Sequence, residues 1–243
     1  MSEDITVIIP VCAMPSHPST EVLDVTIDSI RKRLPDSEII LMFDSPTANL
    51  MEYKENYEKF KQSMLWKLNY MDNATPLLFD QPSHQSLMTK KALELIRTPY
   101  LLWSEQDTPL VGDIPFDKLL PVIESGYANV IRFHFEATIP EAHEHLMLDK
   151  EPIEILGQPF IRTRQWSGRP HLASVKYYKE IASKYWDDQP RFIEHIMYGV
   201  VAETHSDFDE HRGHIYAPKG TLVRSKHLDG RRYGAHTYDP TAS

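Results

Sequence analysis

The chain has 243 residues, of which 41% are hydrophobic and 25% are charged, and this ordinary globular composition excludes disorder along the whole length. Its 26 basic against 35 acidic residues give a formal net charge of −9, which makes nucleic acid and other polyanions less favoured partners. The single cysteine excludes an intramolecular disulfide framework and a multi-cysteine metal site, and a lone thiol predicts a cytoplasmic protein.

A transmembrane segment is not expected, because no apolar run approaches the roughly 20 residues that a bilayer requires. A signal peptide is not expected either, because the acidic start Met1-Ser2-Glu3-Asp4 leads directly into a short apolar run. The length suits one large domain or two small ones, and no linker separates the two halves. We therefore predict a single domain over residues 1–243.

The first half of the chain alternates short apolar runs with amphipathic segments. Residues 5–11 are rich in β-branched side chains, as a strand buried on both faces is, whereas Leu23, Ile27 and Ile30 recur at helical spacing. Strands alternating with helices imply a parallel sheet, and ligands of such sheets bind outside the carboxyl ends of the strands. Strands are predicted over residues 5–11, 38–44, 77–79 and 100–103, and helices over about 20–34, 50–70 and 85–97.

The second half mixes strands and helices. Strands are predicted over residues 129–135, 154–156 and 160–163, with a turn at 157–159, and helices near 174–184 and 190–202. The stretch from Gly213 onward is predicted to be irregular. The whole pattern predicts an α/β fold with a mostly parallel central sheet flanked by helices and mixed strands in the second half.

An acidic turn, Glu105-Gln106-Asp107, follows the fourth predicted strand. Two carboxylates at i and i+2 after a buried strand reach one divalent cation if the turn is tight, and Mg²⁺ and Mn²⁺ take oxygen ligands. The alternative is a solvated acidic turn. Its place at the carboxyl end of a strand favours the metal-binding interpretation.

The segment from Lys90 to Asp107 resembles the central part of the GT-A-fold nucleotide-sugar glycosyltransferases, in which a helix precedes a Tyr-Leu-x-Phe-x-Asp-x-Asp pattern that binds a metal ion on the nucleotide diphosphate. Residues 7–11 resemble the family's first strand. Residues 23–30 resemble its first helix, which often reads Leu-x-x-Thr-Leu-x-Ser-Ile. The resemblance covers roughly residues 5–107 and continues more weakly to about residue 235. Glu105 departs from the family, which usually has Asp there.

The resemblance implies one GT-A-like domain with a nucleotide-sugar-binding half, residues 1–110, and an acceptor-binding half with a C-terminal tail, residues 111–243. It also implies a family-2-like, inverting enzyme. On the donor side it implies that the acidic residue Asp44 contacts the nucleoside and that Pro10 and Val11 line the base pocket. It also implies that the polar or basic residues Gln85, Thr89 and Lys90 face the nucleotide.

Two of these donor-side residues have other interpretations. Asp44 is equally suited to a helix N-cap or an Asx-turn beside Pro46. Lys90 suits a diphosphate as a point charge, but a solvated helix lysine is an equal alternative, and Lys91 competes for the role.

The acceptor side is predicted in two segments. In the turn of residues 166–171, the resemblance implies that Trp166, Arg169 and His171 bind the acceptor, whereas a plain turn with Trp166 in the core is the alternative. Inverting transferases need a carboxylate that takes the proton of the acceptor hydroxyl. Glu194 is the best candidate and His195 the second, and the alternative for Glu194 is stabilisation of a helix start through the dipole.

The densest basic run of the chain is residues 224–232. The resemblance implies that His227 completes the metal shell, and Arg231 and Arg232 are suited to clamp phosphates bidentately. The alternative is a solvated basic tail. A separate hydrolytic metal site is a weaker interpretation, because its candidates match no fixed ligand spacing. They are His205, Asp207, Asp209, His211 and His214.

The resemblance therefore predicts a hexosyl- or pentosyltransferase that moves a sugar from a nucleotide-diphosphate donor to an acceptor hydroxyl. A UDP-sugar is the favoured donor, Mn²⁺ or Mg²⁺ the expected cofactor, and the acceptor is open. Two other classes remain: a nucleotidyltransferase, and a non-catalytic nucleotide-sugar-binding protein on the same fold. The departure at Glu105 keeps the last class open.

Overall fold

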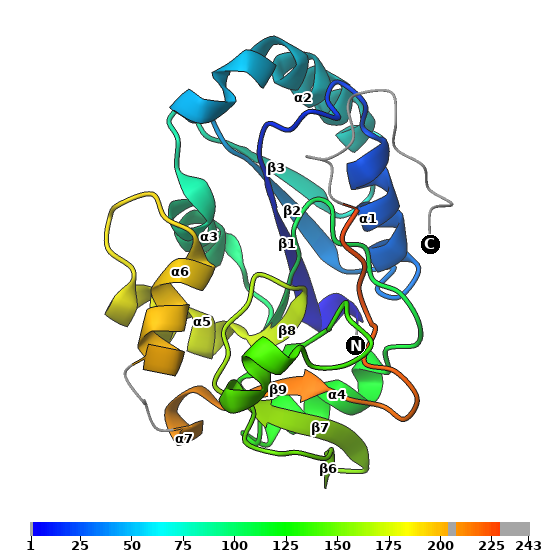
Figure 1. Ribbon diagram of the computed structural model, residues 1–243. Coiled ribbons are helices and arrows are strands. Elements are labelled where there is room, and N and C mark those ends of the chain that lie inside the picture. Colours follow the sequence, from blue (N-terminus) through cyan, green and yellow to red (C-terminus); the bar gives the residue numbers. More distant parts are fainter. Residues whose placement is uncertain (1, 204–207, 229–243) are drawn as a thin grey trace.

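The computed structural model describes residues 2–203 and 208–228. Within these residues one sheet runs through the molecule in the strand order β3-β2-β1-β4-β8-β5-β9-β7-β6. Helices α1 and α2 lie on one side of it, and α3, α5 and α6 lie on the other (Figure 1). The predicted α/β class, with a mostly parallel N-terminal part and mixed strands later, is confirmed.

The N-terminal half confirms the predicted alternation. Strand β1 pairs in parallel with β2 and β4, and β2 pairs in parallel with β3. The predicted helix over 50–70 is a 3-10 helix followed by an α-helix, and the third strand begins three residues earlier than predicted. In chain order the elements are η1 (Ser2–Asp4), β1 (Ile5–Val11), α1 (Glu21–Arg31), β2 (Glu38–Phe43), η2 (Ala48–Tyr53), α2 (Lys54–Leu68), β3 (Ala74–Leu78), α3 (His84–Leu95) and β4 (Tyr100–Trp103).

Strand β1 is the centre of this half. All seven of its residues are buried, as expected for a strand covered on both faces. Ile5, Val7 and Ile9 pack into the cluster formed with α1, α2 and α4, whereas Ile8 packs into the cluster on the opposite face with α3 and α5. This two-residue alternation decides which side chains cover each face, and the parallel direction of β1, β2 and β4 places their carboxyl ends at the same end of the sheet.

The second half inserts antiparallel strands into the sheet. β8 pairs antiparallel with both β4 and β5, while β9 runs parallel to β5 and antiparallel to β7. The elements are α4 (Phe116–Glu124), β5 (Val130–Arg132), η3 (Glu141–Leu146), β6 (Ile153–Ile155), β7 (Gln158–Thr163), β8 (His171–Ser174), α5 (Val175–Tyr185), α6 (Ile193–Tyr198), the π-helical turn η4 (Gly199–Glu203), α7 (Phe208–His211) and β9 (Gly213–Tyr216).

Three features differ from the sequence prediction. The stretch after Gly213 was predicted to be irregular, and this is wrong for β9, which takes its strand geometry from its place between β5 and β7. Strand β8 and helix α4 were not predicted. The hairpin turn between β6 and β7 lies at Leu156 and Gly157, which have φ angles of 48° and 75°, one residue before the predicted turn.

None of the helices in the described part of the chain combines the length and the apolar character that crossing a bilayer requires.

Candidate active site

A cleft of about 860 Å³ opens at the carboxyl ends of β1, β2 and β4. This is the edge at which ligands of parallel α/β sheets bind. Its walls come from the segments that follow these three strands, from the starts of α3 and α6, and from the C-terminal segment of the described chain. The residues that line it include Pro10, Cys12, Asp44, Glu52, Tyr53, His84, Gln85, Glu105, Asp107, Phe192, Glu194, His195 and His227.

Glu105, Asp107 and His227 form a triad in this cleft. Each offers a ligand atom, and these atoms all lie within 4.8 Å of one another. His227 Nε2 lies 3.2 Å from Asp107 Oδ2. The C-terminal segment brings His227 to this place because the Leu228 amide donates to the Asp107 carbonyl oxygen at 2.8 Å and the Lys226 amide donates to the Pro109 carbonyl oxygen at 2.9 Å.

Glu105 is held by Gln85. The amide nitrogen of Gln85 donates to Glu105 Oε1 at 2.8 Å, and the amide oxygen of Gln85 accepts from the Ile193 backbone N–H at 3.3 Å. Gln85 thus ties the start of α3 to the acidic turn and to the start of α6. Burial raises the pKa of Glu105 to about 7, the nearby Asp107 carboxylate adds to the increase, and His227 and Gln85 oppose it.

The triad fits a divalent cation. Two carboxylates and an imidazole are the ligand types that Mn²⁺ and Mg²⁺ sites accept, with the imidazole favouring Mn²⁺. The Asp107 carboxylate adds to the increase that burial causes in the pKa of Glu105. A bound cation would place positive charge beside both carboxylates. Among the described residues, no other group of three or more histidine, cysteine or acidic side chains is arranged for a metal ion.

Glu194 is the second residue of α6, and its carboxylate faces the same point as Glu105. Glu194 Oε2 accepts a hydrogen bond from the Gly168 backbone N–H. A Cβ atom at position 168 would lie 3.1 Å from Glu194 Oε2 and 3.4 Å from Glu105 Oε1. The distance to Glu194 would be shorter than most contacts of a Cβ atom, whereas the distance to Glu105 borders on ordinary van der Waals contact. His195 also lines the cleft.

Asp44 closes β2 and acts on the start of α3. Its carboxylate accepts three backbone N–H bonds, from Ser45 at 2.9 Å, Ser83 at 2.7 Å and His84 at 3.0 Å. Burial raises the pKa of Asp44, while these three bonds oppose the increase. These bonds connect the end of β2 to the start of α3, whose N-cap residue is Ser83, and Asp44 also lines the cleft.

Solved structures similar to this one carry sugar nucleotides. Residues 1–349 of S. aureus TarS, in complex with UDP-GlcNAc, match with a TM-score of 0.57 and 10% identity, over 91% of this chain and 57% of that one. The mannosyltransferase PcManGT from Pyrobaculum calidifontis, in complex with GDP-Man and Mn²⁺, matches with a TM-score of 0.56 and 11% identity, over 95% of this chain and 58% of that one. The chain has a GT-A glycosyltransferase fold.

The GT-A-like chain spans less than two thirds of the length of these neighbours. At this level of identity the likeness concerns the fold, and the residues of the cleft have to be argued from their own geometry. No protein-family model and no curated protein matches the sequence.

The remaining donor-side candidates of the GT-A-like chain divide into two groups. Pro10 lines the cleft. Val11 and Thr89 are fully buried and do not line it, and the Val11 carbonyl oxygen accepts from the Asp44 amide at 2.9 Å. Lys90 turns outward, where its Nζ donates to the Asp187 carbonyl oxygen at 3.1 Å and pairs with Asp188 at 3.3 Å. Arg231 and Arg232 lie outside the described residues.

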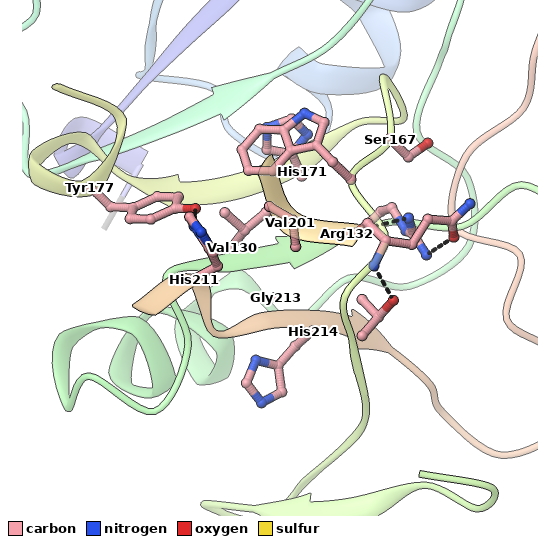
Figure 2. Close-up of a pocket in the computed structure, with 12 residues that line it drawn as sticks. Val130, Arg132, Ser167, His171, Tyr177, Val201, His211, Gly213 and His214 are labelled. Atoms are coloured by element: carbon pink, nitrogen blue, oxygen red, sulfur yellow. Dashed lines mark hydrogen bonds between the residues drawn. The ribbon is translucent and has the colours of Figure 1, made fainter. Parts of the chain in front are cut away.

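The predicted acceptor residues also divide. Trp166 is 7% exposed and His171 is 2% exposed, and neither lines the cleft. They border a separate small cavity of about 20 Å³, which Figure 2 shows with His171, Tyr177 and Arg132 around it. Burial lowers the pKa of His171 to about 4. Arg169 does not line the cleft either, and its Nη2 donates to Glu136 Oε2 at 2.7 Å.

The weaker hydrolytic cluster does not assemble within the described residues. His205 and Asp207 lie outside them. His211 is buried and its Nδ1 shares a hydrogen bond of 2.7 Å with the Tyr177 hydroxyl, while His214 Nδ1 lies 2.9 Å from the Arg212 carbonyl oxygen.

Several residues of the site were not predicted from the sequence: Cys12, Gly168, Phe192 and the segment of Glu52 and Tyr53. Topology could have indicated some of them. Cys12 and the segment of Glu52 and Tyr53 follow the carboxyl ends of β1 and β2, where the predicted topology already placed the ligand.

Proposed function

We propose that this protein is a metal-dependent glycosyltransferase that moves a sugar from a nucleoside-diphosphate donor to an acceptor hydroxyl. The observation that carries the proposal is the convergence of Glu105, Asp107, His227 and Glu194 in one cleft at the carboxyl ends of parallel strands. The volume of about 860 Å³ lies within the range of about 300–1,000 Å³ that is usual for small-molecule sites.

The charge of the cleft supports a role for a cation. Its described lining residues include five carboxylates and no lysine or arginine. A nucleoside diphosphate would be repelled by such a surface unless positive charge came from elsewhere. Glu105, Asp107 and His227 would hold Mn²⁺ or Mg²⁺, which would offset the negative charge that develops on the leaving diphosphate. The five carboxylates are those of Asp44, Glu52, Glu105, Asp107 and Glu194.

Glu194 is the proposed general base. Its Oε2 takes the proton of the acceptor hydroxyl while the acceptor oxygen forms a bond to the anomeric carbon and the bond from that carbon to the diphosphate oxygen breaks. This direct displacement inverts the configuration at the anomeric carbon. The Gly168 N–H orients the carboxylate. Gln85 holds Glu105 by the hydrogen bond to its Oε1.

The donor is proposed to be a UDP- or GDP-sugar, because the two neighbours were solved with UDP-GlcNAc and GDP-Man. The test incubates the protein with a panel of these sugars and Mn²⁺ and analyses the products. Release of free nucleoside diphosphate supports glycosyl transfer, whereas pyrophosphate would assign the protein to the nucleotidyltransferases. Binding without any product would make it a non-catalytic binding protein. Glu194→Gln should lower turnover by about 10²–10⁴-fold.

A further inference from the structure

Phe135 is a large apolar side chain at the edge of the site that is left partly in solvent. It is 37% exposed, whereas Phe133, two residues earlier, is fully buried. Single exposed apolar residues are common and need no explanation. Phe135 differs from such residues in its fixed orientation and in its neighbours.

Arg169 fixes the ring. The Arg169 guanidinium carbon lies 4.0 Å from the centroid of the Phe135 ring, in cation–π geometry. The same guanidinium is held by Glu136, whose Oε2 also lies 3.1 Å from His134 Nε2. Arg169 covers one face of the Phe135 ring, so the exposed part of the ring is the part that the guanidinium does not cover.

This surface adjoins His227 and, through Arg169, the segment that contacts Glu194. The Phe135 and His227 ring centroids are 6.3 Å apart, and His227 belongs to the triad. On the other side Arg169 directly follows Gly168, whose N–H binds Glu194. A ring-shaped molecule on Phe135 would therefore have its edge near the proposed base and near the proposed metal site.

The chemistry of this surface suits a saccharide. A pyranose has a face of C–H groups that packs on an aromatic ring and a rim of hydroxyls that needs hydrogen-bond partners. Phe135 offers the flat apolar surface, and the half-exposed Glu136 carboxylate and Arg169 guanidinium stand at its rim. A lipid chain would cover this ion pair without offering a hydrogen bond to its remaining polar atoms, at a cost in free energy. Trp166 and His171 are too deeply buried to offer such a face.

We propose that the acceptor is a saccharide whose ring stacks on Phe135, with one hydroxyl directed to Glu194. This inference rests on the proposed glycosyltransferase function. It assigns the contact with the acceptor to Phe135, whose ring reaches solvent, in place of the buried Trp166 and His171.

The test uses the full chain with Mn²⁺ and UDP, and a panel of methyl glycosides with gluco, galacto, manno and N-acetylglucosamine configurations as probes. Saturation-transfer NMR reports which glycosides bind. At least one should bind, and its apparent Kd should rise about tenfold or more in Phe135→Ala and in Phe135→Leu, which keeps the volume but loses the flat ring. Phe135→Tyr should restore binding. Tyr127→Ala is the matched control: it removes an aromatic side chain that is 56% exposed and lies before the start of β5, whereas Phe135 follows the end of this strand.

The outcomes separate this inference from the function on which it rests. Thermal stabilisation by UDP and Mn²⁺, measured on each variant, verifies the fold. If UDP stabilises the protein but no glycoside binds, or if Phe135→Leu binds glycosides as well as the unaltered protein does, the saccharide platform is wrong while the donor site stands. If no UDP or GDP nucleotide stabilises the protein with Mn²⁺, the proposed function and this inference fail together.

Discussion

The backbone N–H of Gly168 donates a hydrogen bond to the carboxylate of Glu194, across 26 residues of sequence. This bond connects the segment before β8 with the start of α6, and it sets the direction of the proposed catalytic base. Because Glu105 also approaches position 168, the backbone at Gly168 lies close to both carboxylates.

Gly168→Ala should damage transfer more than stability. The added Cβ would lie 3.1 Å from Glu194 Oε2 and 3.4 Å from Glu105 Oε1, so the Glu194 carboxylate has to move by a few tenths of an ångström or more. A misplacement of about 1 Å costs on the order of 10²-fold in rate, so this smaller shift should cost less than that. Steady-state kinetics and a melting curve on the same preparation check this. An alanine variant as active as the unaltered protein would show that Glu194 does not need this orientation.

Removal of divalent cations should abolish the binding of UDP. The five carboxylates of the cleft repel the diphosphate when no cation is bound. With Mn²⁺, UDP at about 100 times its Kd should stabilise the fold by about 2.7 kcal/mol, and EDTA should remove this gain. His227→Ala should raise the Mn²⁺ concentration required by at least ~10-fold.

The matched control for the metal experiment is His145→Ala, an exposed histidine in η3. Equal stabilisation by UDP with and without EDTA would contradict the metal role of the triad.

Lys90→Met should leave the affinity for the donor nucleotide within about twofold, as substitutions away from a site usually do. Its ammonium group binds the Asp187 carbonyl oxygen and the Asp188 carboxylate outside the cleft. Isothermal titration with UDP and Mn²⁺ measures the effect. A tenfold loss of affinity would instead place Lys90 at the phosphates.

His17 should make the fold sensitive to acid. Its ring is 2% exposed, and it stacks on Phe60 with the ring centroids 3.9 Å apart. Burial lowers the pKa of His17 from 6.5 to about 3. Between these values the unfolded chain binds a proton that the folded chain does not, so this contribution to stability is complete above about pH 6.5 and is lost as the pH falls.

Between pH 7 and pH 5 the burial of His17 should lower the free energy of unfolding by about 2 kcal/mol. Urea denaturation at both pH values measures it. His17→Phe should lose correspondingly less stability over the same interval, although it also loses the bond that His17 Nδ1 accepts from the Met14 amide. If both proteins lose the same stability, the imidazole of His17 is not the group responsible.

Sequence reasoning succeeded where burial alone sets the structure. β1 and β4 are continuous apolar runs covered on both faces, and their boundaries agree with the prediction. β8 and β9 were missed because four-residue strands take their geometry from the neighbours between which they lie. Helix α4 was missed although its apolar residues face the core, and it contains Pro121, which is unfavourable inside a helix.

In the candidate site, too, residues whose position follows from one strand were predicted, whereas residues whose position depends on packing between elements were not. Glu105 and Asp107 were found because two carboxylates directly after a buried strand have few other places to point, and the structure brings His227 to them. The direction of Lys90 depends on the rotation of α3, and the burial of Trp166 depends on α5 packing above it. Neither can be inferred from the spacing of residues within one segment. Phe135 became a candidate only when the position of Arg169 was known.

The pairing of residues 225–228 with residues 107–110 also shows where the third ligand of the proposed cation site comes from. All strands of the described residues precede His227 in the sequence, since β9 ends at Tyr216. A chain truncated after β9 would therefore keep every described strand and both acidic ligands but would lack the imidazole. The proposed cation site thus depends on a segment that contributes no strand to the sheet.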